Sequence, residues 1–61
     1  MKEMSTKQLS EFTKILKEEN LKFKRKHEKK GKIYYVCVDE KGEEKELTIM
    51  WAGDMVMMYS F

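Results

Sequence analysis

Apolar side chains between residues 6 and 19 recur at the spacing of an amphipathic helix, and lysine and glutamate occupy many of the positions between them. Ser5 followed by Gln8 fits a capping box, in which the N-cap side chain and the side chain at the third helical position each accept a backbone N–H. Asn20 suits the left-handed conformation that often ends a helix. The pattern therefore predicts a helix over residues 6–19, with an apolar stripe formed by Leu9, Phe12, Ile15 and Leu16.

From residue 21 onwards the apolar period changes to the two-residue alternation of a strand. Gly31 and Gly42 suit three-residue hairpin loops, and Gly53-Asp54 suits a two-residue turn. The segments predicted to be strands are 21–27, 32–39, 46–51 and 55–61. The sequence thus predicts one α+β domain over residues 1–61, in which an N-terminal helix packs on one face of a four-stranded antiparallel β-meander.

These loop lengths fix a register, and the register sorts the strand residues onto two faces. The expected pairs are Phe23–Cys37, His27–Ile33, Tyr35–Leu47, Ile33–Ile49, Trp51–Val56 and Ile49–Met58. Because Leu21 follows the helix directly, we expect the helix to cover the face that carries Leu21. That face also collects Phe23, Ile33, Tyr35, Cys37, Leu47, Ile49, Trp51, Val56 and Met58.

The opposite face of the predicted sheet has no helix left to cover it, although it is rich in valine, methionine and aromatic residues. An open apolar face of this kind is larger than most monomers leave exposed. We therefore expect it to bind a protein partner or a second copy of the chain. The residues predicted to make this contact are Tyr34, Val36, Met50, Met57, Tyr59 and Phe61.

Charge is distributed unevenly along the chain, although the formal net charge is only +2. Residues 1–32 carry eleven Lys or Arg against five Asp or Glu, whereas residues 33–61 carry two against six. A basic first half beside apolar and aromatic strands suggests an alternative function, nucleic-acid binding on the sheet surface with tyrosines stacking on bases. The residues of this alternative are Lys22, Lys24, Lys26, Lys29, Lys30 and Tyr34. Lysines on an edge strand also protect it against aggregation without binding anything.

The candidate chemistry is sparse. His27 is the only histidine, and no serine or carboxylate is placed by the sequence as its partner, so an RNase-like toxin that relies on His27 is a third and weaker interpretation. Cys37 is the only cysteine and falls mid-strand on the predicted core face, which excludes an internal disulfide and a multi-cysteine zinc site. We expect no catalytic residue, no metal site and no cofactor.

Taken together, these patterns predict a small non-enzymatic interaction or regulatory protein that acts like an inhibitor, by covering a working surface of its partner. Compact single-domain binders of this type are often encoded by phages and mobile elements, and such an origin is suggested for this chain by association. The single thiol suits a reducing cytoplasm. No apolar run is long enough to span a membrane and no signal peptide is visible, so we expect a cytoplasmic protein that does not bind membranes.

Overall fold

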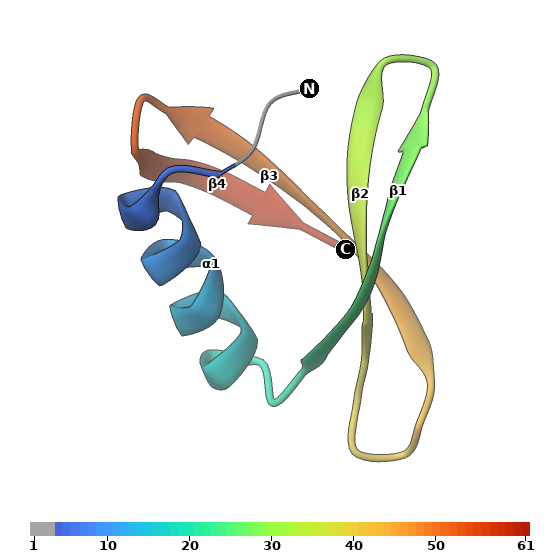
Figure 1. The fold of residues 1–61 in the computed structure, drawn as a ribbon. Helices are drawn as coiled ribbons and strands as arrows, with labels where there is room; N and C mark the ends of the chain where they lie inside the picture. Colours follow the sequence, from blue (N-terminus) through green and yellow to red (C-terminus); the bar gives the residue numbers. More distant parts are fainter. Residues whose placement is uncertain (1–3) are drawn as a thin grey trace.

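The computed structural model describes residues 4–61. It consists of one helix, α1 (Thr6–Glu18), and four strands, β1 (Lys22–Lys29), β2 (Lys32–Val38), β3 (Glu44–Ala52) and β4 (Met55–Ser60). The strands are antiparallel and lie in the order β1-β2-β3-β4 (Figure 1). The predicted α+β architecture, a helix followed by a four-stranded meander, is therefore confirmed.

The capping box that the sequence predicts is present at the start of α1. Ser5 Oγ accepts the backbone N–H of Gln8 at 3.1 Å, and Gln8 Oε1 accepts the backbone N–H of Ser5 at 3.0 Å. The same two side chains also fix the helix to the turn between β3 and β4. Ser5 Oγ donates to Asp54 Oδ1 at 2.9 Å, and Gln8 Nε2 donates to the carbonyl of Gly53 at 3.1 Å. The helix cap thus positions α1 against the C-terminal hairpin.

The far end of α1 closes as the sequence predicts. Asn20 adopts a left-handed conformation with φ of 55°, and the backbone N–H of Leu21 donates to the carbonyl of Leu16 at 2.8 Å. This is the six-to-one hydrogen bond of a Schellman ending, and it turns the chain from the helix directly into β1.

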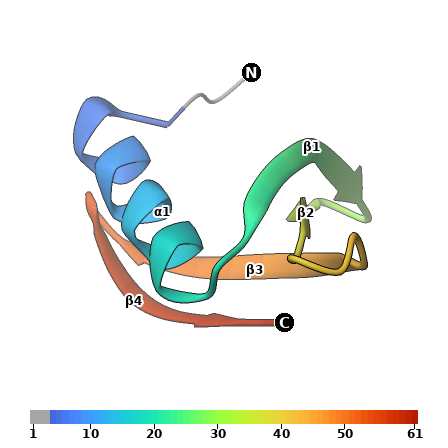
Figure 2. The ribbon, with the colours of Figure 1, turned by 90° about the horizontal axis from the view of Figure 1, so that it is seen from below.

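The core lies between α1 and the sheet (Figure 2). Its buried members are Phe12, Ile15, Leu21, Cys37 and Leu47, and Tyr35, Ile49, Val56 and Tyr59 pack against them. The ring of Phe12 lies 4.9 Å from that of Tyr35 and 5.7 Å from that of Phe23, measured between centroids. Most of the predicted core face is therefore confirmed, but Phe23, Ile33, Trp51 and Met58 lie outside the buried cluster.

The first hairpin differs from the predicted register. Phe23 pairs with Cys37 as expected, but His27 pairs with Tyr34 and not with Ile33. The turn has only two residues, Lys30 and Gly31, both left-handed with φ of 52° and 78°, which is the backbone of a type I′ turn. A β-bulge between Phe23 and Arg25 absorbs the displaced residue.

The third hairpin contains a second bulge. Trp51 pairs with Val56 as predicted, but Ile49 pairs with Tyr59 and Met50 pairs with Met58. Met57 is the extra residue on β4, so the strand beyond it shifts by one position. As a result Tyr59 turns towards the core and Met58 turns away from it, which reverses the predicted sides of both residues.

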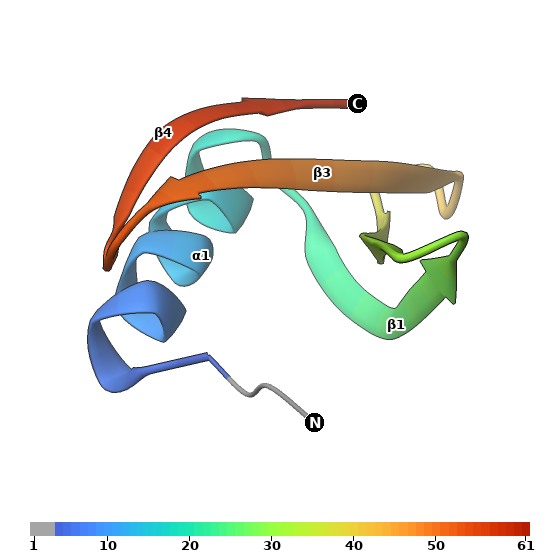
Figure 3. The ribbon, with the colours of Figure 1, turned by 90° about the horizontal axis from the view of Figure 1, so that it is seen from above.

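The middle pairing, between β2 and β3, is short. Tyr35 pairs with Leu47 as predicted, and the ladder continues to Val38 and Glu44. The predicted Ile33–Ile49 pair is not part of it. Beyond the Tyr35–Leu47 pair, β2 and β3 are no longer paired. Because each hairpin is twisted, the β1–β2 and β3–β4 hairpins diverge there, and β1 curves away from β3 (Figures 1 and 3). This divergence opens a cleft between β2 and β3.

Candidate functional site

A cleft of about 580 Å³ opens where β2 and β3 separate. Its β2 wall includes Ile33 and Tyr34, and its β3 wall includes Ile49, Met50 and Trp51, while Met58 reaches it from β4. Within the described part of the chain, Lys32 is the only charged residue that lines the cleft. The volume falls within the range of about 300–1,000 Å³ that is common for ligand pockets, and the lining mixes apolar side chains with hydroxyl-bearing residues such as Tyr34, Thr48 and Ser60.

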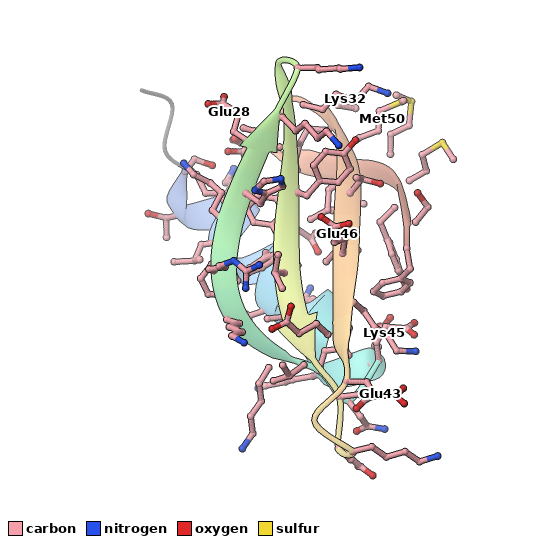
Figure 4. All side chains as sticks on the ribbon, turned by 90° about the vertical axis from the view of Figure 1, so that its right-hand side faces the viewer. Glu28, Lys32, Glu43, Lys45, Glu46 and Met50 are labelled. Atoms are coloured by element: carbon pink, nitrogen blue, oxygen red, sulfur yellow. The ribbon has the colours of Figure 1, made fainter. Side chains whose placement is uncertain are left out.

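Four methionines form an exposed surface beside this cleft, which we call the methionine patch. Its members are Met50 (53 % exposed), Met55 (67 %), Met57 (60 %) and Met58 (56 %). Met50 and Met58 form a cross-strand pair and also line the cleft, so the patch and the cleft are continuous. Figure 4 shows Met50 at the same end of the sheet as Lys32, far from Glu43 and Lys45 at the other end.

The methionine patch makes up a large part of the apolar surface that the described chain leaves exposed. Among residues 4–61, six apolar side chains are buried, whereas seven large apolar side chains are exposed, four of them in the methionine patch. Methionine is unbranched and polarisable, and it recurs on surfaces that adapt to a partner. A domain with so small a core gains stability when such a surface is covered.

The six residues predicted to bind a partner do not form one surface. Met50 and Met57 are exposed in the methionine patch, and Tyr34 is half-buried in the wall of the cleft. Tyr59 faces the core side, where its hydroxyl donates to Glu19 Oε2 at 3.0 Å. Phe61 is exposed and its ring packs edge-on against that of Tyr59 at 6.1 Å. The prediction that Tyr59 lies on the open face is therefore wrong. Phe61 also leaves that face, because its ring packs against Tyr59.

Val36 requires a further correction, because only 2 % of it is exposed. It lies between Arg25 on β1 and Glu46 on β3, its neighbours in the two ladders. The apolar stems of such long side chains cover small neighbours while their charged ends stay in water. Val36 is therefore a structural residue, and it has no surface to offer a partner.

Sequence reasoning missed two members of the site. Met55 was not among the predicted contact residues, and Met58 was expected in the core. The bulge at Met57 is what exposes Met58, and no local sequence signal marks a bulge between two methionines. The cleft itself was also missed, since the alternation of side chains carries no information on where paired strands separate.

The lysines of the nucleic-acid alternative do not form a regular row along β1. Lys22 pairs with Val38, on the face turned away from the helix, but Lys26 pairs with Tyr35, whose side chain belongs to the helix side. The bulge brings Arg25 opposite Val36 in its place. Lys29 closes the hairpin and Lys30 lies in its turn. A regular row formed by Lys22, Lys24 and Lys26 therefore does not exist.

Two of the basic side chains are already paired. Lys24 Nζ hydrogen-bonds Glu44 Oε2, and the guanidinium of Arg25 lies 3.7 Å from the same oxygen. The hydrogen bond and the charge of Lys24 lower the pKa of the Glu44 carboxyl from its ordinary value, and Arg25 adds to the effect. The basic hairpin is thus partly neutralised by the acidic end of β3.

This ion pair predicts a pH dependence. Because the pKa of Glu44 is lowered in the folded chain, its stabilising contribution is present above the ordinary glutamate pKa of about 4.3 and is lost as the pH falls through the folded-state pKa. NMR titration of the Glu44 carboxyl carbon should give a midpoint below that value. Lys24→Met should move the midpoint back up, whereas Lys41→Met, in the neighbouring turn, should leave it unchanged. An unchanged midpoint in the Lys24 variant would contradict the pairing.

Candidate catalytic and metal-binding groups remain scattered. His27 is exposed on β1, with its ring 6.2 Å from that of Tyr34. Across the described part of the chain, no three His, Cys, Asp or Glu side chains are grouped so that they could hold a metal ion.

No helix within residues 4–61 is long and apolar enough to cross a membrane. No family model, curated protein or solved structure matches the chain.

Proposed function

We propose that the chain is a small non-enzymatic interaction protein whose methionine patch and adjoining cleft bury against a protein partner. The single observation that carries this proposal is the exposure of four methionines, each more than half accessible, on two neighbouring strands. A surface of adaptable apolar side chains beside a hollow of about 580 Å³ suits a protein partner that inserts an apolar side chain. Covering the partner in this way would regulate it by occlusion, in the reducing cytoplasm that a lone thiol suits.

Nucleic-acid binding is the alternative, and one feature favours it. Lys22, Arg25 and Tyr34 share a face of the sheet, and Lys29 and Lys30 extend it at the hairpin tip. The same face, however, carries the carboxylate of Glu44, which already pairs with Lys24 and Arg25. We therefore rank protein binding first and include nucleic acid as an outcome of the test.

The test is capture of partners by the immobilised chain at two salt concentrations. Met58→Lys places a charge in the middle of the methionine patch, and burying a methionine is worth about 1.5–3 kcal/mol, so we expect this variant to bind at least about tenfold more weakly. Ser10→Lys, on the exposed side of α1, is the matched control and should bind like the original chain. Both variants should keep the far-UV circular dichroism of the original.

Two results would contradict the proposal. One is capture that Met58→Lys does not weaken. The other is binding that survives Met58→Lys but is lost in Lys22→Glu and falls steeply between about 50 and 200 mM salt, since release of counterions from a nucleic acid has that signature.

A further inference from the structure

We infer that the chain forms a symmetric dimer in which β4 pairs antiparallel with β4 of a second copy, so that two sheets join into one. This inference rests on the proposed function, because it names a second copy of the chain as a partner of the surface around the methionine patch. The two edges of the sheet, the backbone at the β4 edge and the self-complementarity of β4 each support it.

The two edge strands of the sheet differ strongly in charge. β1 has the sequence KFKRKHEK, with five Lys or Arg and one Glu, and such charges keep one edge from pairing with another. β4 has the sequence MVMMYS, with no charged residue and no proline. Natural proteins usually protect exposed edges with charges, so an uncharged, methionine-rich edge on a sheet whose other edge is highly charged marks β4 as the edge that pairs.

The backbone of β4 offers hydrogen bonds at this edge. Ala52 and Met55 close a two-residue turn and form a hydrogen-bonded pair, and the alternation along β3 makes Met50–Met58 and Thr48–Ser60 hydrogen-bonded pairs as well. Ile49–Tyr59, which lies between them, is a non-hydrogen-bonded pair. The N–H and C=O of Tyr59 therefore point away from β3, towards the free edge. No backbone bond outside the strand ladders engages them among residues 4–61.

The side chain of Tyr59 holds this part of the edge in place. Its ring packs against the core, and its hydroxyl donates to Glu19 at the end of α1. That hydrogen bond raises the pKa of the Tyr59 hydroxyl, because it favours the protonated form beside a carboxylate. An edge that is already ordered loses little further conformational entropy when it pairs.

A two-fold axis at Tyr59 makes the interface self-complementary. Antiparallel pairing centred there sets Tyr59 opposite Tyr59 of the second copy, with two mutual backbone hydrogen bonds. In the same register Met58 comes opposite Ser60 of the second copy, and both lie on the face of the sheet that carries the methionine patch. Met58 is more than half exposed in the single chain, so the pairing covers part of its side chain. The bulge at Met57 confines regular pairing to the strand after it, so the contact is short.

The experiment measures the oligomeric state by sedimentation from about 1 µM to about 1 mM. We expect a monomer–dimer equilibrium within this range. A synthetic chain with an N-methyl group on Tyr59 keeps every side chain and removes only the outward N–H, and its dimerisation should weaken at least about tenfold. The matched control is N-methyl Glu28. By the same alternation this residue, paired with Ile33, points to the free edge of β1, and its modification should change nothing.

A second set of variants tests the register and does not depend on the modified backbone. Met58→Glu and Ser60→Lys should each weaken the dimer, and the double variant should restore it, since the register brings the two new charges together across the two-fold axis. A monomer at every concentration would overturn the inference. So would a dimer that survives N-methylation of Tyr59 but is lost in Met50→Lys, since that pattern indicates face-to-face packing. Either result leaves the capture experiment above to judge the proposed function separately.

Discussion

Leu47→Ala is expected to leave the chain largely unfolded or close to unfolding at 25 °C. Leu47 has no exposed surface and belongs to the buried cluster under α1. Truncating a fully buried leucine costs about 2–5 kcal/mol, because the transfer energy and the cavity both count. A domain of 61 residues has a free energy of unfolding of only about 3–9 kcal/mol. One side chain therefore accounts for a large share of the stability.

The position of Leu47 adds to the effect. It pairs with Tyr35 at the last rung of the β2–β3 ladder, just before the two hairpins diverge. Among residues 4–61 this short ladder is the only strand pairing that joins the two hairpins, so a cavity at this rung weakens the connection between them as well as the packing under the helix.

The measurement is urea unfolding followed by circular dichroism, with Met55→Ala as the control. Met55 is exposed, so its truncation should change the free energy of unfolding by no more than about 0.5 kcal/mol in a monomer. The concentration should be kept low enough that self-association does not contribute. Equal effects of the two substitutions would contradict the core described above.

The elements of the fold were predictable because their signals are local. Ser5 and Gln8 mark the start of α1 by hydrogen bonds within one turn, and Asn20 marks its end by a single left-handed residue. The glycines that separate the strands act in the same way, since Gly31, Gly42 and Gly53 all have positive φ. Short-range signals of this kind specify the same local conformation in any fold that keeps the turn.

The register was predictable only in part, because it depends on how many residues each turn uses. Lys30 adopts φ of 52°, which a lysine rarely does, and the turn therefore needs two residues where a glycine-centred loop of three was expected. The first bulge then restores the expected pairing at Phe23–Cys37. The position of a β-bulge depends on the twist of the whole sheet, so the sequence between two turns does not predict it.

The candidate site was also predictable only in part, where the alternation along a strand places a side chain. The exposure of Met50 and Met57 follows from alternation along strands, and both were predicted. Tyr59 and Met58 exchange sides because of the bulge, and Val36 is covered by charged neighbours on the strands beside it. The cleft arises from divergence between two hairpins, which is a property of the assembled sheet.

Cys37 gives the second large effect, because it should be strongly protected from thiol reagents in the folded chain. The residue has no exposed surface, and its thiol donates to the carbonyl of Tyr35 at 3.5 Å. Burial also raises the pKa of the Cys37 thiol, which reduces the reactive thiolate further. Labelling then requires unfolding, so it should be slower than in urea by a factor on the order of 10² to 10⁶, the range that corresponds to about 3–9 kcal/mol.

The labelling rate is measured with a chromogenic disulfide reagent, with and without denaturant, on the only cysteine of the chain. Leu47→Ala should accelerate native-state labelling by roughly 10²-fold if the cavity costs about 3 kcal/mol, whereas Met55→Ala should leave the rate nearly unchanged. Native labelling as fast as in urea would show that Cys37 is accessible, and the cysteine would then have to be considered as a reactive group and not as part of the core. Slow labelling in the original chain and fast labelling in the Leu47 variant would tie the thiol, the β2–β3 ladder and the helix to one cooperative unit.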